Sequence, residues 1–178
     1  MNQLSGIIVP ALLLLVVTSC KKEVRDQTGE DNFLQSISLK QQSAEADLLQ
    51  SVRNATSRFH STIQAIEAGY EADEHCVSVP GLGGMGYHWV NPSLVDPVFD
   101  PLNPEAILYA SGPGGKLHLV AVEYIVIDVG QPRPSFGDQL FDIGGAPIPV
   151  PHWTLHAWLY EANPAGMFKP FNPNVSCP

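Results

Sequence analysis

The sequence AILYASGPGGKLHLVAVEYIVI, residues 106–127, gives the strongest indication of fold in this chain. Two runs of β-favouring residues, Ala106–Ala110 and Leu117–Ile127, flank a short segment that is rich in glycine. Apolar runs separated by a few residues with Gly and Pro are typical of a β-hairpin. This sequence therefore predicts two neighbouring antiparallel strands.

Two further segments extend the expected sheet. HWTLHAWLY, His152–Tyr160, is rich in aromatic and β-favouring residues, and CVSV, which precedes Pro80, is a short fourth candidate. Between the second and third strands, prolines interrupt residues Gly130–Pro151. We expect an irregular loop there, serving as a lid, a binding loop or a cover for a sheet face.

A helix is expected before the strands, from about Ser43 to Ala68, with Gly69 as its natural end. Apolar residues recur there at spacings of three or four, at Leu48, Val52, Ala55, Phe59, Ile63, Ile66 and Tyr70. A helix of this length needs a packing partner. We therefore predict an α+β fold, with a long N-terminal helix on a small, mostly antiparallel sheet, loops rich in Pro and Gly, and one disulfide.

The N-terminus indicates export and lipidation. The apolar run Ile7–Val17 is too short to span a bilayer but fits the apolar region of a secretory signal, and LVVTSC resembles a bacterial lipobox ending at Cys20. We predict a signal peptide over residues 1–19, lipidated Cys20 followed by a polar tether to residue 40, and one globular domain over 41–178. Because residues 1–19 contain no Lys or Arg, an ordinary signal or a membrane anchor with unmodified Cys20 is the alternative.

Cysteine number and charge limit the possible partners. Lipidation of Cys20 leaves Cys76 and Cys177, which we expect to form a disulfide in an oxidising compartment. The alternative, a metal site at His75 and Cys76, lacks companion ligands at a suitable spacing. A net charge of −9 with 9 Lys and Arg argues against nucleic acid as a partner.

GLGGMGYHWVNP, residues 81–92, contains four glycines but does not resemble a phosphate-binding loop. Such loops lead into a helix, whereas here the glycines lead into Tyr-His-Trp-Val-Asn-Pro. We expect the glycines to permit a tight turn beside other backbone, which would hold Tyr87, His88 and Trp89 in place.

Glu123 is unusual because it interrupts an apolar stripe. With strand alternation it would share one face with Leu117, Leu119, Ala121, Ile125 and Ile127. A buried, unpaired carboxylate is costly, so Glu123 should be protonated, ion-paired or metal-bound. A structural partner from the helix, namely Arg53, Arg58 or His60, is the alternative to a functional site.

His152 and His156 are the other candidates for chemistry. In a strand they share a face with Thr154 but lie about 13 Å apart, too far for one metal ion. Two solvent-facing histidines beside Trp158 are the simpler interpretation. If this strand buries Trp153, Leu155 and Leu159, His156 faces away from Glu123, and a joint site needs a bulge, a closed barrel or unforeseen strand neighbours.

Several segments resemble a family of secreted or lipid-anchored bacterial proteins to which no activity is assigned. They are GMGYHWVNP, LVAVEYIV, the ATSRFHSTIQAIEAGY helix and the closing LHAWLYEANPAGMFKPFNPNVSC. The resemblance covers about residues 50–177 and implies that His88, Glu123 and His156 form a shared site. SCKKE, after the signal, is similar to lipoproteins of the Bacteroidetes type, which implies an outer-membrane anchor whose domain faces either the periplasm or the outside.

These observations lead to three functional hypotheses. The first is a lipid-anchored envelope protein that holds a divalent metal ion or small ligand near His88, with Glu123 and His156. Its aromatic walls would be Tyr87, Trp89 and Trp158. The second is a hydrolase-like enzyme with Glu123 as general base and a histidine as acid or metal ligand. The third is a structural or interaction lipoprotein.

Overall fold

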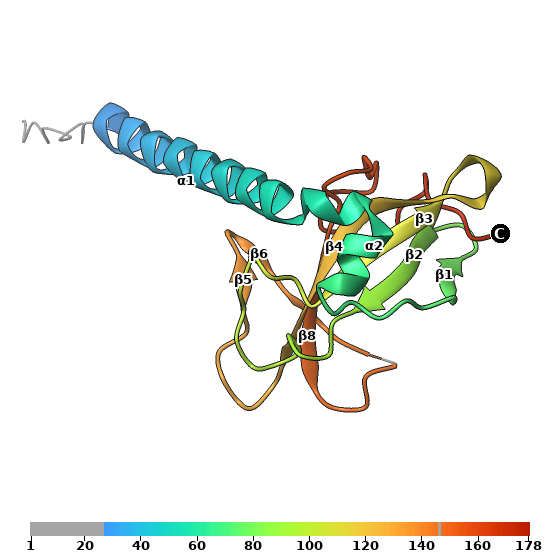
Figure 1. Cartoon of the computed structure of the whole chain (residues 1–178). Coiled ribbons are helices and arrows are strands. Elements are labelled where there is room, and N and C mark those ends of the chain that lie inside the picture. The colour runs from blue at the N-terminus through green and yellow to red at the C-terminus, as the bar shows by residue number, and fades with distance from the viewer. Residues whose placement is uncertain (1–26, 146) are drawn as a thin grey trace, which may run out of the picture. The chain divides into compact units, whose positions relative to one another are not determined.

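A computed structural model describes residues 27–145 and 147–178 (Figure 1). The expected signal peptide over residues 1–19, Cys20 and the first part of the expected tether lie outside the described residues. Residues 37–178 form one compact unit, and residues up to Ser36 belong to another.

The larger unit is built on a six-stranded antiparallel sheet in the order β1-β2-β3-β4-β8-β7, which confirms the α+β class. The strands are β1 Cys76–Val79, β2 Gly83–Val90, β3 Ala106–Ser111, β4 Leu117–Ile127, β7 Asp142–Ile143 and β8 His152–Ala157. The predicted hairpin is confirmed as β3 and β4, joined through a short 3-10 turn at Pro113–Gly115 (η2).

Strand β2 was not expected as a strand, because four glycines lie at its start and just before it. Their role is close backbone approach, as predicted. A Cβ atom on Gly86 would lie 2.2 Å from the carbonyl oxygen of Tyr109, and one on Gly83 would lie 2.1 Å from that of Asn172. Glycine therefore allows β2 to pack tightly between its neighbours, and no helix follows these glycines.

The helical region differs from the prediction at its start and in its interior. Helix α1 spans Gln27–Thr56, so residues 27–40, where an irregular polar tether was expected, are helical. This segment contains no Pro and a single Gly, so it can continue a helix that is already formed and packed further along the chain. In the described part of the chain, no helix combines the length and apolar character needed to cross a membrane.

The predicted helix is also interrupted after Thr56. A 3-10 turn, η1 Ser57–His60, leads to a separate helix, α2 Thr62–Glu67, whose N-terminus is capped by the Ser61 side chain. The interruption turns Ala65 toward the core and leaves Ile63 and Ile66 exposed, so the expected stripe does not continue through them. Gly69 ends the helical region with a φ of 97°, as predicted.

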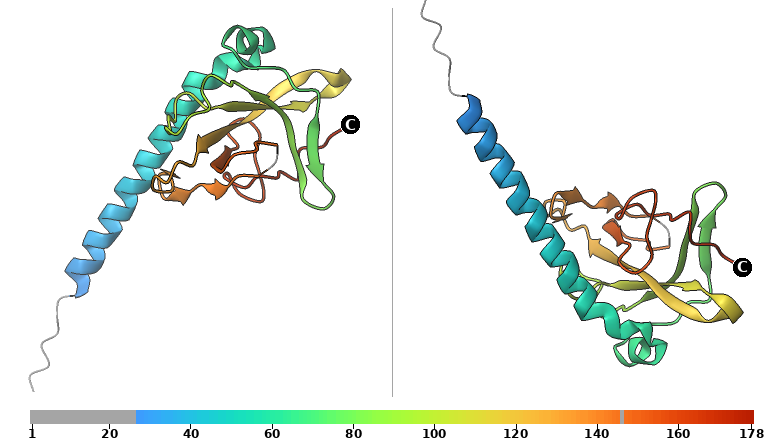
Figure 2. Two further views of the ribbon diagram at one scale, coloured as in Figure 1. Left: turned by 90° about the horizontal axis from the view of Figure 1, so that it is seen from below. Right: turned by 90° about the horizontal axis from the view of Figure 1, so that it is seen from above.

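Both faces of the sheet are buried. On one face, Val52, Phe59 and Ala65 from the helices pack against the strands. On the other face, the C-terminal segment and the loop before β8 pack through Val175 and Ile148. Figure 2 shows the helices and the C-terminal segment on opposite sides of the curled strands. We call these the helix face and the inner face.

A β-bulge at Val120 changes which β4 residues share a face. Leu108 of β3 pairs with Ala121, but the next residue, Tyr109, pairs with Leu119. Leu119 therefore belongs to the helix face, whereas Ala121 lies on the inner face. The expected stripe around Glu123 is thus wrong for Leu117 and Leu119, because the extra residue reverses the alternation.

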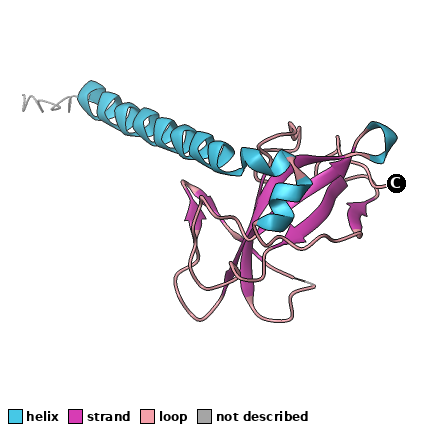
Figure 3. Cartoon of the chain, viewed as in Figure 1, coloured by secondary structure: helices cyan, strands magenta, loops and turns pink. Residues whose placement is uncertain are grey.

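The connection from β4 to β8 is mostly irregular (Figure 3), as expected, but it contains more structure than its prolines suggested. Strands β5 Ser135–Phe136 and β6 Gln139–Leu140 form a small hairpin, and β7 pairs with β8. Phe136 and Phe141 are fully buried on the helix face beside Tyr124. The loop therefore covers the sheet, which is one of the three roles expected for it.

The expected disulfide is present between Cys76 and Cys177, whose Cα atoms are 5.6 Å apart across a sequence separation of 101. Cys76 pairs with Tyr87 across β1 and β2. The bond therefore fastens the C-terminal segment to the strand next to β2.

Candidate functional site

Glu123 and His156 are direct cross-strand partners in the β4 and β8 pair. Directly opposed residues of antiparallel strands point to the same side of the sheet. The expectation that His156 faces away from Glu123 is therefore wrong. It assumed a single buried face, whereas Leu155 is buried on the helix face and His156 is buried on the inner face.

The expected pair of solvent-facing histidines is also wrong. His152 is 6% exposed and His156 is 5% exposed. The Nδ1 atom of His152 lies 2.8 Å from the carbonyl oxygen of Val150, so this histidine is held by its own loop. Of these two histidines, only His156 contacts the cluster that contains Glu123.

His88 reaches Glu123 from β2, two strands away. On the intervening strand β3, Ala106 is the direct partner of Glu123 and Leu108 is the partner of His88. Because Ala106 carries only a methyl group, the longer side chains of Glu123 and His88 can approach each other across it. The strand neighbour that brings the two residues together is β2, which the sequence had not revealed.

The three side chains converge on one point, and we call them the triad. The Nε2 atom of His88 lies 3.5 Å from Oε2 of Glu123 and 3.4 Å from Nε2 of His156. The Nε2 atom of His156 lies 3.9 Å from Oε1 of Glu123. One nitrogen or oxygen atom from each residue lies within 4.8 Å of the others, a group that could hold a metal ion.

The protonation states suit metal ligands. Burial lowers the pKa of His156, against the attraction of Glu123. Burial also opposes ionisation of Glu123, but positive charge on His156 and His88, when they are protonated, and the hydrogen bond from Thr154 together favour it more strongly. The pKa of Glu123 therefore lies below its usual value. A neutral imidazole and an ionised carboxylate are the forms in which these side chains bind metal.

Two histidines and one carboxylate are a ligand set for Zn²⁺ and for other first-row divalent ions. Three protein ligands would leave a further coordination position for water or another ligand. The side chains of His88 and Glu123 retain 18% and 12% of their exposure, so the triad is not sealed from solvent. This arrangement can bind a metal ion, and with a bound water it could support hydrolysis.

Thr154 supports the triad and was not identified as functional from the sequence. Its hydroxyl donates a hydrogen bond to Oε1 of Glu123 and so fixes the carboxylate. The available signal was its position two residues before His156, on the same side of the strand. Its importance depends on the pairing of β8 with β4, which the sequence did not establish.

The expected aromatic walls are divided between the two faces. Trp89 packs against Tyr109 on the helix face, with ring centres 4.7 Å apart and the rings inclined by 57°, and Tyr87 packs on that face as well. Neither lines the space around the triad. Trp158 does belong to the inner face, where it is 2% exposed.

The alternative partners of Glu123 also lie elsewhere. The guanidinium of Arg53 lies over Tyr160, that of Arg58 lies over Phe59, and His60 contacts Tyr160. Within the described residues, the ion-pair partners of Glu123 are the two histidines of the triad.

Comparisons of the chain with protein-family models, with curated proteins and with solved structures find no match.

Proposed function

We propose that this protein is a lipid-anchored cell-envelope protein that binds a divalent transition-metal ion through His88, Glu123 and His156. The observation that carries the proposal is the convergence of three potential ligand atoms within 4.8 Å, drawn from three strands. Zn²⁺ is the first candidate, because imidazole and carboxylate ligands both suit it.

The arrangement of the triad suits a shared cation. The two imidazole nitrogens face each other at 3.4 Å beside a carboxylate, and either a hydrogen bond between the rings or a metal ion bound by all three side chains accounts for this approach. A metal ion satisfies all three side chains at once. The hydroxyl of Thr154, bonded to the carboxylate, is the kind of outer contact that orients a metal ligand.

The test is metal content and affinity. The full chain, purified in mild detergent with its disulfide intact, is analysed for metal by mass spectrometry and then stripped and titrated with Zn²⁺. We expect one ion per chain. His88→Ala, Glu123→Gln and His156→Ala should each weaken binding at least about tenfold, because each removes one of three ligands.

His118→Ala is the matched control, because His118 is exposed on the same strand as Glu123. It should bind Zn²⁺ as the parent does. A metal-free protein that also fails to bind added Zn²⁺, Mn²⁺, Fe²⁺ or Cu²⁺ would reject the metal site. Equal weakening in His118→Ala would show that the bound ions are adventitious.

We also propose that Cys20 carries lipid and that the protein resides at the outer membrane. The support is the apolar segment Ile7–Val17 followed by TSC, together with the SCKKE context. Labelling cells with an alkynyl palmitate should mark the parent protein but not Cys20→Ala. Density fractionation should place the labelled protein with the outer membrane, and label in a soluble fraction would contradict the proposal.

A hydrolase-like enzyme is a second candidate. It is favoured by the incomplete ligand set, since three protein ligands with residual exposure are typical of catalytic zinc sites. Hydrolysis of p-nitrophenyl acetate should then rise in proportion to bound Zn²⁺ and be lost in Glu123→Gln. A metal-loaded protein with no activity above that of Glu123→Gln would leave metal binding as the function.

A further inference from the structure

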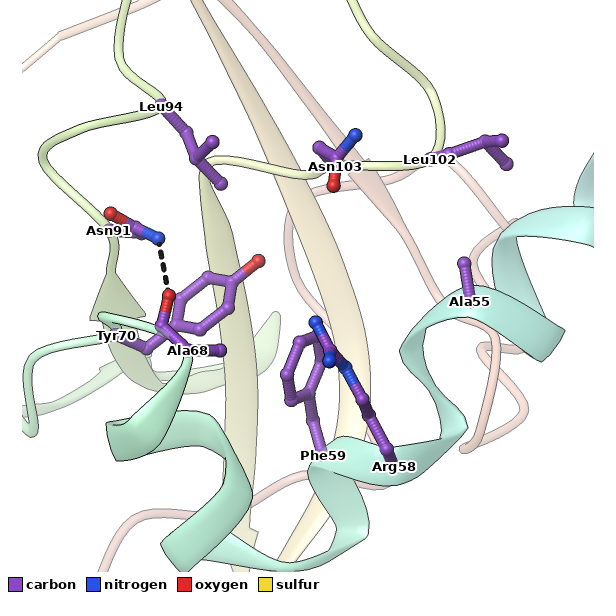
Figure 4. A pocket seen from close by; sticks show the side chains of 9 residues that line it. All are labelled: Ala55, Arg58, Phe59, Ala68, Tyr70, Asn91, Leu94, Leu102 and Asn103. Carbon is purple, nitrogen blue, oxygen red and sulfur yellow. Dashed lines mark hydrogen bonds between the residues drawn. The ribbon is translucent and has the colours of Figure 1, made fainter.

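We propose that a second site, on the helix face and independent of the triad, binds a small organic monocarboxylate with an apolar body. The site is a pocket of about 280 Å³ between the end of the helical region and the loop after β2 (Figure 4). It is lined by Ala55, Arg58, Phe59, Ala68, Tyr70, Asn91, Leu94, Leu102 and Asn103.

The inner wall of the pocket is aromatic and rigid. Phe59 and Tyr70 meet edge to face at a ring distance of 5.0 Å, and each is 3% exposed. The Tyr70 hydroxyl donates to the carbonyl oxygen of Pro104 at 2.6 Å, which fixes the ring. Leu94 and Leu102 provide apolar contacts on the side of the loop (Figure 4). Because both rings are almost fully covered and Leu102 is 44% exposed, a small apolar ligand body would lie against the leucines at the open side of the pocket and would not be enclosed by it.

Arg58 gives the pocket its charge. Its guanidinium carbon lies 4.7 Å from the centre of the Phe59 ring, and Figure 4 shows the guanidinium directed into the pocket. In the part of the chain that the structure describes, no carboxylate forms an ion pair with Arg58. The planar guanidinium therefore keeps its donors for a carboxylate, which it can bind in a bidentate manner.

The asparagines around the pocket differ in their role. Asn91 is structural, since its Nδ2 donates to Ala68 and its Oδ1 accepts from the backbone of Ser93. Asn103 uses Nδ2 to donate to Asp100, while its Oδ1 points toward the pocket (Figure 4). That oxygen can accept a hydrogen bond from an N–H group of the ligand. The site therefore favours a carboxylate whose apolar body also carries an amide.

A single cation limits the charge of the ligand. Arg58 is the one basic side chain lining the pocket, Asp100 is bonded to the neighbouring Asn103, and the whole chain carries a net charge of −9. These charges disfavour a dianion such as a phosphate monoester. A monoanion is balanced by Arg58 alone.

The test uses N-acetyl-L-leucine as the probe and its neutral amide, N-acetyl-L-leucinamide, as the matched ligand. Both are titrated by calorimetry into the metal-stripped full chain in detergent. We expect the acid to bind about tenfold more tightly than the amide, from the charge-assisted contact with Arg58. Arg58→Gln should remove that difference, and Leu94→Trp, which fills the pocket, should abolish binding of both.

Arg53→Gln is the matched control. Arg53 lies five residues earlier in the sequence and also packs over an aromatic ring, that of Tyr160, but does not line the pocket. It should bind the acid as the parent does, and thermal melting should confirm that each variant is folded. Equal affinity for acid and amide, tighter binding of phenyl phosphate, or equal loss in Arg53→Gln would overturn the proposal.

Discussion

Two glutamates at the sheet, Glu123 partly buried and Glu105 fully buried, differ in their state of ionisation. Glu123 faces two imidazoles and a hydroxyl, which stabilise its ionised form. Glu105 is 1% exposed, and its carboxyl accepts a hydrogen bond from the backbone N–H of Ile125. Burial raises the pKa of Glu105 to about 8, so this group is neutral at pH 7. An ionised and a neutral glutamate thus lie close together on neighbouring strands, since Ala106, the residue after Glu105, pairs with Glu123.

Glu105 should make stability depend on pH. Between its ordinary pKa of 4.5 and about 8, the folded state keeps a proton that the unfolded chain has released. The free energy of unfolding should therefore fall as pH rises through this range, by a few kcal/mol in total, and level off above it. Glu105→Gln should remove this decline, because its amide oxygen can still accept from Ile125.

The measurement is urea unfolding of the parent protein and of Glu105→Gln from pH 5 to pH 9. The variant should gain stability relative to the parent with rising pH, since all other titrating groups are shared. Parallel curves for the two proteins would contradict a neutral, buried Glu105.

The glycines of β2 affect a whole element, because they set how closely two strands approach. Gly86 has a φ of 94°, and a Cβ atom there would lie 2.2 Å from the carbonyl oxygen of Tyr109. We expect Gly86→Ala to lower the free energy of unfolding by about 3 kcal/mol, from strain and steric overlap together. Gly114 has a similarly positive φ of 72° but lies in open space, so Gly114→Ala should lower the free energy of unfolding by only about 1 kcal/mol. Equal losses in denaturant melts would show that the close approach is unimportant.

The disulfide joins the edge strand β1 to the C-terminal segment. Removing it with Cys76→Ser and Cys177→Ser should lower the free energy of unfolding by about 3–5 kcal/mol, because it closes a long loop in the unfolded chain. Reduction of the parent protein should give the same shift of the urea midpoint. An unchanged midpoint in the double variant would mean that the noncovalent contacts, namely the packing of Val175 and the backbone hydrogen bonds between Asn172 and Gly84, are enough to hold this segment.

Elements with a clear period or composition, the hairpin and the disulfide could be predicted from the sequence, whereas the order of the strands and the contacts between distant strands could not. The strands at 76–79 and 117–127 match the expected limits, and the cysteine pairing is confirmed. Strand β2 was missed because glycine has low strand propensity, and its need for glycine arises only from the neighbouring backbone. His88, Glu123 and His156 were identified individually, but whether they meet depends on strand order and on which faces are buried.

At the level of the whole molecule, metal binding and stability should be linked. An ion that binds the folded state stabilises it in proportion to the logarithm of its concentration, by about 2.7 kcal/mol at one hundred times the dissociation constant. For a chain of 178 residues this corresponds to a rise in melting temperature of about 5–10 °C.

Calorimetric melts with and without Zn²⁺ test this linkage. The parent should show the rise, and His156→Ala should not. An equal rise in His156→Ala would place the stabilising ion outside the triad.

Burial of the sheet on both faces has a consequence for how uniquely the chain specifies its pairing. A strand with one apolar face is held in register because a shift of one residue would expose its apolar side chains. Strand β4 is not held in register in this way, because it has apolar side chains on both the helix face and the inner face, and either set could be buried on either face. Glu123 distinguishes the native register from one shifted by one residue, because only the native register brings its side chain to His88 and His156. The triad therefore also helps to select the strand register, and substitutions in it would affect which register forms as well as ligand binding.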